Sequence, residues 1–525
     1  MKNKKLSSVL ICILIVALLG VISSAWVHQN YLYFNNRFIP RKGEILDLRH
    51  MELTTEDMQE LRALFPGKKI IWNVPFQGLQ YSQTQELQIS SLTMEELELL
   101  DYLPELTRVD ASGCTDYEAL EALQARRPEC EVNYQVIVGG IGWDKSADSL
   151  EVKDPDADEL TRQIPYLKNL TYVHLSGQLP EAEALFRLRD AFPHIRFIWE
   201  LEVGPLTTDC TAETLDLSGI ALTYDEALRI LSLLPDLKEL DMRGCGLTDA
   251  EMIALADSFP ECFLVWEMEA FGLTFSTDIT ELDISGFKMD SPEPIEQLLP
   301  YLKNLEKVYM SHCGLDDETM DALNKRHPSV RFVWSVYIKG FYIPTDAIYF
   351  YPYKLNTELY LSTQDLYPLR YCTDLICIDI GHQTAVYNCD WAAYMPDLQY
   401  LIIAHTSITD LSPLVNCKKL KYLEIFLLDL KDYSPLLELT ALEDLNMGCT
   451  YADPAPIAKM TWLKNLWWFD AYAYGKPCSG AEELLAEALP NTVQKYHIEH
   501  STAGGWRKLD GYFEMRDIMG MFYLK

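Results

Sequence analysis

Leucine and other apolar residues recur in short phrases along this chain. The clearest phrase, L-x-x-L-x-L-x-x-C, occupies residues 237–245, and variants of it recur from about residue 45 to residue 498. A strand this short cannot bury its apolar side alone, so stacked copies must share one core. The pattern therefore predicts an α/β solenoid, a horseshoe with a parallel sheet on its concave face and one broad face open to other molecules.

The repeats before about residue 340 are long. Their steps of 63, 65 and 67 residues separate copies that start at Leu87, Leu150, Leu215 and Leu282. In the copy that starts at Leu215, one helical pattern follows the first strand and ends at Pro235, and a second covers residues 248–259. We therefore expect helices on the outside of the N-terminal part of the solenoid.

An aromatic strand closes each long repeat. Its aromatic residue stands six positions after a proline, at Trp72, Tyr134, Trp199, Trp266 and Trp334. Apolar and polar residues alternate along residues 197–203, as in a half-buried strand, so we interpret the aromatic column as core. The alternative is a row of aromatic platforms for sugars, because Trp is rarely wholly buried. The turn glycines that follow, such as Gly272 and Gly340, indicate that this strand forms a projecting hairpin.

After about residue 355 the repeat becomes shorter. Strand leucines at Leu375, Leu398, Leu420 and Leu442 are separated by 23, 22 and 22 residues, which leaves no room for a full helix. Ser-Pro-Leu sequences start at residues 412 and 434, where the outer face must turn. We expect 3₁₀ or turn segments outside in this C-terminal part.

On these residues the chain resembles the leucine-rich repeat superfamily. Residues 237–255, with Cys245, are similar to the long helix-bearing repeats of the ribonuclease-inhibitor type, a likeness that extends over about residues 45–340. Residues 398–420 are similar to the 22-residue repeats of bacterial internalins, and this likeness extends over about residues 355–470. The resemblance implies a solenoid and protein–protein interaction, and it is more specific for fold than for function. The aromatic strand and its glycine turn belong to neither standard repeat.

The N-terminus carries an export signal. Three lysines, at positions 2, 4 and 5, precede an apolar stretch over residues 6–27 that contains no charged residue. Because about 20 apolar residues span a bilayer, we interpret residues 1–27 as a signal-anchor helix of a single-pass bacterial membrane protein with its repeats extracytoplasmic. The small residues 23–25 leave open the alternative that signal peptidase cleaves after Ala25 and the protein is secreted.

Three of the thirteen cysteines are predicted to be free thiols, the disulfide status of the others stays open, and no metal site is predicted. Cys114, Cys245 and Cys313 share one inward repeat position, and equivalent positions lie beyond the roughly 7 Å that a disulfide allows between Cα atoms. The later cysteines lack the close C-x-x-C pairing of structural zinc sites, so we predict no metal and no cofactor. His312 beside Cys313 suggests a catalytic dyad, but neighbouring residues on a strand face opposite ways.

The charge balance narrows the class of partner. The chain has 44 basic and 78 acidic residues, a formal net charge of −34. Such a chain repels nucleic acid and anionic membrane surfaces, so nucleic-acid binding is excluded.

Acidic residues concentrate at one strand position, the outward residue between the last two apolar positions of each repeat. By repeat, this column contains Asp47, Gln88, Asp110, Glu151, His174, Asp216, Asp241, Asp283, Tyr309, Tyr360, Asp379, Ile402, Glu424, Asn446, Asp470 and His497. Nine of these sixteen residues are acidic and none is basic, which is several-fold above the share of acidic residues in the chain. Arg49, Lys153 and Arg243 lie two positions further on and can neutralise their own strand's acid.

Two hypotheses explain this acidic column. The first is a ligand-binding surface on the concave face for a cationic or polyhydroxylated partner, since complementary potentials speed encounter and select partners. The candidate residues are Asp216, Asp241, Asp283, His174, Glu151, Tyr309 and Tyr360. The second is that aspartate at a strand end accepts hydrogen bonds from neighbouring backbone groups and has only a structural role.

The pattern divides the chain into five parts. These are the helix at 1–27, a juxtamembrane linker at 28–43, long repeats at 44–340, short repeats at 341–500 and a C-terminal cap at 501–525. The cap is expected because the end of a solenoid must be covered, and residues 511–520 supply apolar side chains to fold over the last coil. A ligand site in this segment is the alternative.

The function predicted is recognition. The motifs G-x-S-x-G, H-E-x-x-H and G-x-x-x-x-G-K-[ST] are absent, so we expect no enzyme. We predict a non-enzymatic extracytoplasmic protein that binds a protein or glycan ligand at the cell surface through the concave face and contacts the membrane through its N-terminal helix. The alternative is a structural scaffold of the cell envelope that uses the solenoid edges or the cap.

Overall fold

The computed structural model describes residues 2–355, 359–469 and 480–521, and the chain forms two compact units. Unit 1 contains residues Met1–Thr214 and Tyr224–Leu237, and unit 2 contains Leu215–Thr223 and Lys238–Lys525. The predicted Asp470 lies outside the described residues. Each unit is built from the repeat that the sequence predicts.

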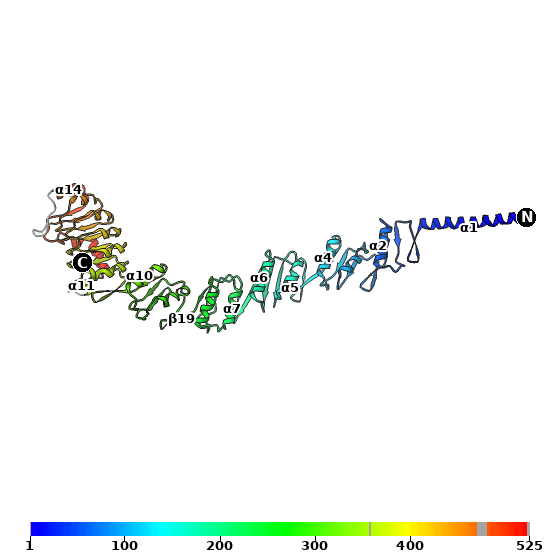
Figure 1. Ribbon diagram of the computed structural model, residues 1–525, viewed down its shortest axis with the longest axis horizontal. Helices are drawn as coiled ribbons and strands as arrows, with labels where there is room; N and C mark the ends of the chain where they lie inside the picture. Colours follow the sequence, from blue (N-terminus) through cyan, green and yellow to red (C-terminus); the bar gives the residue numbers. More distant parts are fainter. Residues whose placement is uncertain (1, 356–358, 470–479, 522–525) are drawn as a thin grey trace. The chain divides into compact units, whose positions relative to one another are not determined.

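Unit 1 begins with helix α1 (Lys2–Asn30), which continues without a loop into hairpin β1 (Tyr31–Phe34) and β2 (Arg37–Pro40) (Figure 1). Its segment Cys12–Asn30 is long and apolar enough to cross a membrane, by length and composition. The residues expected as a linker therefore contain a paired hairpin. The hairpin turn uses Asn35 and Asn36, both at positive φ, as a two-residue turn between twisted strands requires.

Short parallel strands and helices alternate through the rest of unit 1. The strands of the parallel ladders are β3 (Ile45–Asp47) with β4 (Lys69–Ile71), β7 (Glu86–Gln88) with β8 (Arg108–Asp110) and β9 (Glu131–Asn133), and β12 (Ser149–Lys153) with β13 (Tyr172–Ser176) and β14 (Arg196–Val203). The helices are α2 (Thr55–Leu64), α3 (Met94–Leu100), α4 (Tyr117–Arg126), α5 (Ala157–Gln163), η1 (Ile164–Tyr166), α6 (Ala182–Ala191) and α7 (Tyr224–Leu233).

Unit 2 repeats this order and then changes it. Its long repeats contain β16 (Thr214–Asp216, whose first residue is in unit 1), β17 (Glu239–Asp241), α8 (Asp249–Ser258), β18 (Phe263–Val265), β21 (Glu281–Asp283), α9 (Glu293–Glu296), η2 (Leu299–Tyr301), β22 (Lys307–Tyr309), α10 (Asp317–Arg326) and β23 (Arg331–Val333). The helices predicted before Pro235 and over residues 248–259 are confirmed as α7 and α8.

Helix starts follow from local chemistry. Thr248 accepts the Glu251 backbone N–H, and the Glu251 carboxylate accepts the Thr248 N–H, which is a capping box. Thr54 and Thr93 form the same arrangement at α2 and α3. Asp316 caps α10, so this acid is occupied by the helix start.

Seven parallel strands form the last sheet of unit 2. They are β26 (Tyr349–Phe350), β27 (Cys377–Asp379), β28 (Tyr400–Ile402), β29 (Tyr422–Glu424), β30 (Asp444–Asn446), β31 (Asn465–Trp467) and β32 (Val493–Lys495). The helical elements are α11 (Pro352–Leu355), α12 (Thr363–Leu366), η3 (Tyr367–Tyr371), η4 (Asp390–Tyr394), η5 (Ser412–Asn416), η6 (Ser434–Glu438), α13 (Pro454–Ile457), α14 (Ala481–Ala488), η7 (Trp506–Lys508) and α15 (Asp510–Ile518). The predicted 3₁₀ segments at the Ser-Pro-Leu sequences are confirmed by η5 and η6.

One core runs through the second half of unit 2. It contains the repeat leucines from Leu282 to Leu489, most of them less than 5% exposed. Strand residues such as Val308 and helix residues such as Leu323 share this core, as stacked coils with a common interior require.

The aromatic column is buried, as the alternation predicts. Trp199 is 1% exposed, Trp266 3% and Trp334 5%, so the alternative of surface sugar platforms is wrong. The indole N–H groups of Trp266 and Trp334 donate to the first carboxylate of the preceding helix, Asp249 at 2.9 Å and Asp317 at 2.8 Å. These bonds satisfy the one polar atom that burial of the ring would otherwise leave unpaired.

Hairpins follow the aromatic positions, also as predicted. They pair antiparallel as β5 (Val74–Phe76) with β6 (Leu79–Tyr81), β10 (Gln135–Val138) with β11 (Ile141–Asp144), β14 with β15 (Leu206–Asp209), β19 (Glu267–Ala270) with β20 (Leu273–Ser276), and β24 (Ser335–Ile338) with β25 (Phe341–Pro344). Each hairpin ends one short parallel ladder before the next begins, so the single sheet expected along the solenoid is divided into separate ladders before residue 349.

The cysteines of the shared repeat position are free and buried. The thiol of Cys245 donates to the Leu217 carbonyl at 3.1 Å, and that of Cys313 donates to the Ile284 carbonyl at 3.3 Å. Burial raises the pKa of both thiols. His312 lies outside the core with its ring edge on Tyr342, so it forms no dyad with Cys313.

Candidate functional site

Six of the seven candidate residues lie in strands of the parallel ladders. Glu151 in β12 and His174 in β13 are paired neighbours in unit 1. Asp216 and Asp241 end the adjacent strands β16 and β17, and Asp283 and Tyr309 are paired on β21 and β22. Glu151, Asp216 and Asp283 are exposed, while His174, Asp241 and Tyr309 are half-buried. The candidates thus form three separate pairs.

Tyr360 is not in a strand, so its predicted position is wrong. The strand of that coil is β26, and Tyr360 is 75% exposed two residues before Ser362, the N-cap of α12. Its neighbours Leu359 and Leu361 are buried, but the Leu361 N–H donates to the Gln383 side chain rather than to a strand. The L-x-L pattern at residues 359–361 therefore places two leucines in the core without forming a strand. His497 is likewise outside β32, in which Lys495 pairs with Trp467.

The aspartates at strand ends have a local structural role. Each accepts the backbone N–H of the residue two positions further on: Ser218 to Asp216 at 2.9 Å, Arg243 to Asp241 at 3.0 Å and Ser285 to Asp283 at 2.9 Å. Asp47, Asp110 and Asp379 accept in the same way. These Asx turns supply the structural explanation for aspartate at this position. They leave the exposed side of the carboxylates accessible.

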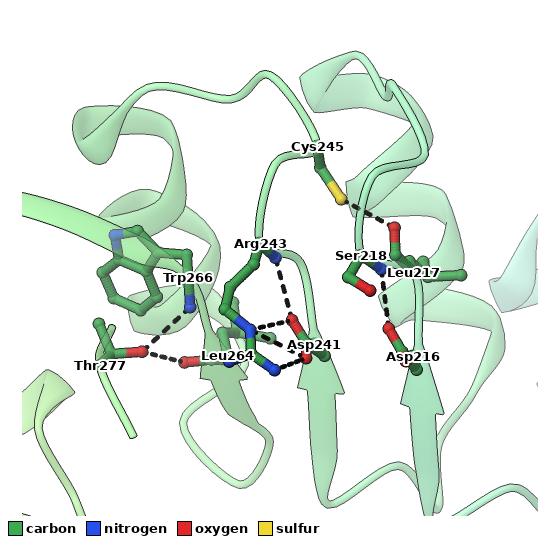
Figure 2. A network of polar contacts seen from close by, with 9 residues as sticks. All are labelled: Asp216, Leu217, Ser218, Asp241, Arg243, Cys245, Leu264, Trp266 and Thr277. Atoms are coloured by element: carbon green, nitrogen blue, oxygen red, sulfur yellow. Dashed lines mark hydrogen bonds and ion pairs between the residues drawn. The ribbon is translucent and has the colours of Figure 1, made fainter. Parts of the chain in front are cut away.

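Figure 2 shows the pair at Asp216 and Asp241. Arg243 folds back on its own strand end, and its Nε donates to both carboxylate oxygens of Asp241, at 3.0 and 3.1 Å. Asp216 accepts instead from Ser218, and hydrogen bonds from the Ser218 hydroxyl and backbone, with a smaller contribution from the Arg243 charge, lower the pKa of its carboxyl. Asp241 is therefore locally neutralised, whereas Asp216 keeps its charge at neutral pH.

The next ladder carries a row of hydroxyl groups beside Asp283. The Ser311 backbone N–H donates to the Ser285 hydroxyl at 3.2 Å, and the hydroxyls of Ser311 and Ser335 are 2.9 Å apart. Lys307 lies 5.3 Å from the centre of the Tyr309 ring and forms an ion pair with Asp346 at 3.4 Å. Within the described residues, Asp283 forms no ion pair with a lysine or arginine.

An aromatic cluster lies beside this row and was missed by the sequence reasoning. Tyr337 and Tyr342 face each other across hairpin β24/β25, with ring centres 5.4 Å apart, and each is 56% exposed. His312 packs against Tyr342 at 4.4 Å. The signal that could have located it is the polar–apolar alternation of residues 335–338, which places Ser335 and Tyr337 on the same side of the strand.

One member of the pair in unit 1, His174, contacts an acid of its own sheet. His174 Nε2 lies 3.3 Å from a carboxylate oxygen of Glu200, and His174 is half-buried. The fold thus uses His174 in a contact within its own sheet.

The strand face of the seven-stranded sheet is covered by the chain itself. Residues 501–521 lie across it, and Trp506, Tyr512 and Met515 share a buried cluster with strand residues Tyr400 and Tyr422. The Trp467 indole donates to the Ala503 carbonyl at 2.9 Å, and the Asn446 amide to the Ser501 carbonyl at 2.8 Å. The segment expected to cap the last coil instead covers this face, because its apolar residues find aromatic strand residues there.

A buried carboxylate fixes this C-terminal segment. Glu424 in β29 is 0% exposed, forms an ion pair with Arg507 at 2.9 Å and accepts the Trp506 indole N–H at 2.8 Å. Part of the Asp379 surface still reaches solvent, but desolvation, with Glu424 nearby, raises the pKa of Asp379 to about 7. Asp379 and Glu424 are therefore removed from the list of accessible acids.

No metal site is evident in the part of the chain that the structure describes: no group of three or more His, Cys, Asp or Glu side chains is placed to hold an ion there. The nearest approach of this kind is the pair His382 and His405, whose Nδ1 atoms are 2.9 Å apart.

Comparison with known proteins gives structural neighbours only. No protein-family model matches the chain, and no curated protein matches it. An internalin of Listeria monocytogenes is 13% identical over 83% of this chain and 88% of its own, with a TM-score of 0.22. Internalin C2 of the same species is 17% identical over 45% of this chain and 83% of its own, with a TM-score of 0.21. A leucine-rich repeat protein of Leptospira interrogans is 15% identical over 78% and 93%, with a TM-score of 0.21.

These scores are too low to carry an argument about this chain. The fold of the chain is therefore assigned from its own repeat. The phrase L-x-x-L-x-L forms a parallel strand with buried leucines in coil after coil. The repeat in the sequence and the parallel pairing in the structure together show a fold of stacked leucine-rich coils.

Proposed function

We propose that this chain is a non-enzymatic binding protein that recognises a protein partner through one surface of unit 2. This surface, the open strand face, consists of Asp216, Asp241, Asp283, Tyr309, Ser311, Tyr337 and Tyr342. The observation that carries the proposal is the contrast between two faces of the same kind. The chain covers the strand face of its seven-stranded sheet with its own residues 501–521, whereas the open strand face keeps exposed acids and aromatic rings.

The chemistry of the open strand face favours a protein with a basic patch. Asp216 and Asp283 are exposed and supply negative charge, and tyrosine supplies rigid contact area at low conformational cost. The buried aromatic column supplies no ring platforms for a sugar, so the exposed rings of the open strand face are those of Tyr337 and Tyr342.

The proposal includes a location. Helix α1 supports attachment to a membrane, because its apolar residues suffice to span a bilayer. The lysines at positions 2, 4 and 5 favour a cytoplasmic N-terminus, with the repeats on the extracytoplasmic side. The net charge of −34 supports a partner that is a protein rather than nucleic acid.

Site-specific photo-cross-linking tests the function. A photoreactive amino acid placed at Ser285, which is exposed on the open strand face, should give a discrete cross-linked protein in intact cells. The matched control is Lys325, which is exposed on helix α10 of the same repeat. Identical products at both positions would contradict recognition through the open strand face, and products at Lys325 alone would favour a scaffold that uses the outer surface.

A further inference from the structure

The hairpin β1/β2 has two different faces. Ile39 on one face is 1% exposed and belongs to the buried interior. Tyr33 and Phe38, paired on the opposite face, are 57% and 60% exposed, with ring centres 5.0 Å apart. Tyr31 lies on the same face, and Trp26 of helix α1 extends this row with its ring 6.1 Å from Tyr31. One face is thus built into the protein, and the other presents aromatic rings outward.

The position of this aromatic face follows from the length of α1. The apolar stretch ends at about Val27, and Tyr31 comes four residues later, which is about 6 Å at 1.5 Å per residue. Each polar layer of a bilayer is roughly 5–7 Å thick outside a hydrocarbon core of about 30 Å. The hairpin therefore begins at the depth of the lipid headgroups, where Trp and Tyr are enriched in membrane proteins.

The charge of the N-terminal segment is opposite to that of the rest of the chain. Residues 1–43 contain six of the 44 Lys and Arg residues and none of the 78 Asp and Glu residues. Three of these basic residues, Arg37, Arg41 and Lys42, are exposed on or directly after the hairpin. The backbone N–H of Arg41 donates to the Asn30 carbonyl at 2.7 Å, so the base of the hairpin is bonded to the end of the helix.

We propose that the aromatic face of this hairpin is a membrane-binding site for anionic phospholipid. Tyr31, Tyr33, Phe38 and Trp26 lie among the headgroups, and Arg41 and Lys42, which directly follow the hairpin, contact lipid phosphates. Each basic residue near an anionic surface adds attraction that salt weakens, while the remainder of the strongly acidic chain is repelled from that surface. The hairpin thereby holds the first coil close to the membrane surface and is not a flexible linker. This inference rests on the proposed membrane location of α1 and not on the open strand face.

Depth-dependent quenching in nanodiscs tests the proposal on the full chain. A fluorescent amino acid replaces Phe38, and lipids with quenchers at the headgroup depth are added to discs of phosphatidylglycerol with phosphatidylcholine. The matched control position is Gln80, which is exposed on the equivalent hairpin β5/β6 of the next repeat. We expect strong quenching at position 38 and little at position 80. In Arg41→Gln/Lys42→Gln, or in discs of phosphatidylcholine alone, quenching at position 38 should fall toward the control level.

The outcomes separate the two proposals. A chain that does not enter nanodiscs overturns the membrane location of α1 and the hairpin site with it. A chain that enters while position 38 is quenched no more than position 80 overturns the hairpin site alone. If position 38 is shielded only in discs that contain two chains, the aromatic face contacts a second copy and the lipid assignment is wrong.

Discussion

Substitution of Arg507 should release the C-terminal segment from the strand face it covers. In Arg507→Met, the Glu424 carboxylate loses its ion pair and stays fully buried, with the Trp506 indole and Tyr422 hydroxyl as its remaining partners. Removal of one partner of a buried pair typically costs 3–5 kcal/mol, because the other charge is left uncompensated. Since 36% of the Arg507 side chain is exposed, we expect the lower end, about 3 kcal/mol.

Hydrogen exchange of the α15 amides measures this cost locally. About 3 kcal/mol corresponds to roughly a hundredfold faster exchange, at 1.4 kcal/mol for each factor of ten. The double variant Arg507→Met/Glu424→Gln should recover much of the protection, because it removes the buried charge as well. The matched control is Arg49→Met, whose ion pair with Asp47 is about half exposed, and α15 exchange should not change there. Unchanged exchange in Arg507→Met would refute the reasoning.

Three further predictions follow from the contacts described. Burial raises the pKa of the Asp379 carboxyl from 3.8 to about 7, so the folded state binds the carboxyl proton more tightly than the unfolded state does. The free energy of unfolding gained from this proton is present below pH 3.8 and is lost as pH rises to about 7. Thermal melts of Asp379→Asn should accordingly lack that loss and exceed the wild type above pH 7; parallel melting curves would contradict the desolvation. Native-state alkylation should leave Cys245 and Cys313 unmodified until urea is added, because their thiols are buried with raised pKa values; rapid labelling would place them outside the core. Thr248→Ala removes the cap of α8 and should cost about 1 kcal/mol in urea unfolding, whereas Thr248→Ser should cost little.

Periodicity predicts those parts of the fold that local burial decides. The spacing of proline to tryptophan predicts a buried ring in each long repeat, whereas the partner of the indole N–H varies from Asp249 for Trp266 to the Leu233 carbonyl for Trp199. The Ser-Pro-Leu sequences predict η5 and η6 because 22 residues hold a strand and one short turn of 3₁₀ helix. Free cysteines at the repeat position follow from burial as well, and the thiols of Cys245 and Cys313 donate to backbone carbonyls of the preceding strand segment.

Contacts between distant segments are not visible in the repeat. Residues 501–521 contain apolar side chains that could cover either the last coil or a strand face, and the aromatic strand residues that decide between them lie about 80 to 110 positions earlier. The Tyr360 prediction fails because Leu359 and Leu361 have the spacing of a strand and are buried, but the segment pairs with no strand. The acidic column is explained in part by Asx turns, so its composition alone does not identify a binding surface.

The affinity of the partner captured at Ser285 tests the central claim most directly. The variant Asp216→Asn/Asp241→Asn/Asp283→Asn removes three charges but keeps a side-chain oxygen to accept each turn N–H, so the fold should be preserved. We predict weaker binding to this variant, with a smaller salt dependence, and unchanged binding to the control Lys325→Gln on α10. Equal affinity of the triple variant and the wild type, with unchanged salt dependence, would contradict recognition through the open strand face.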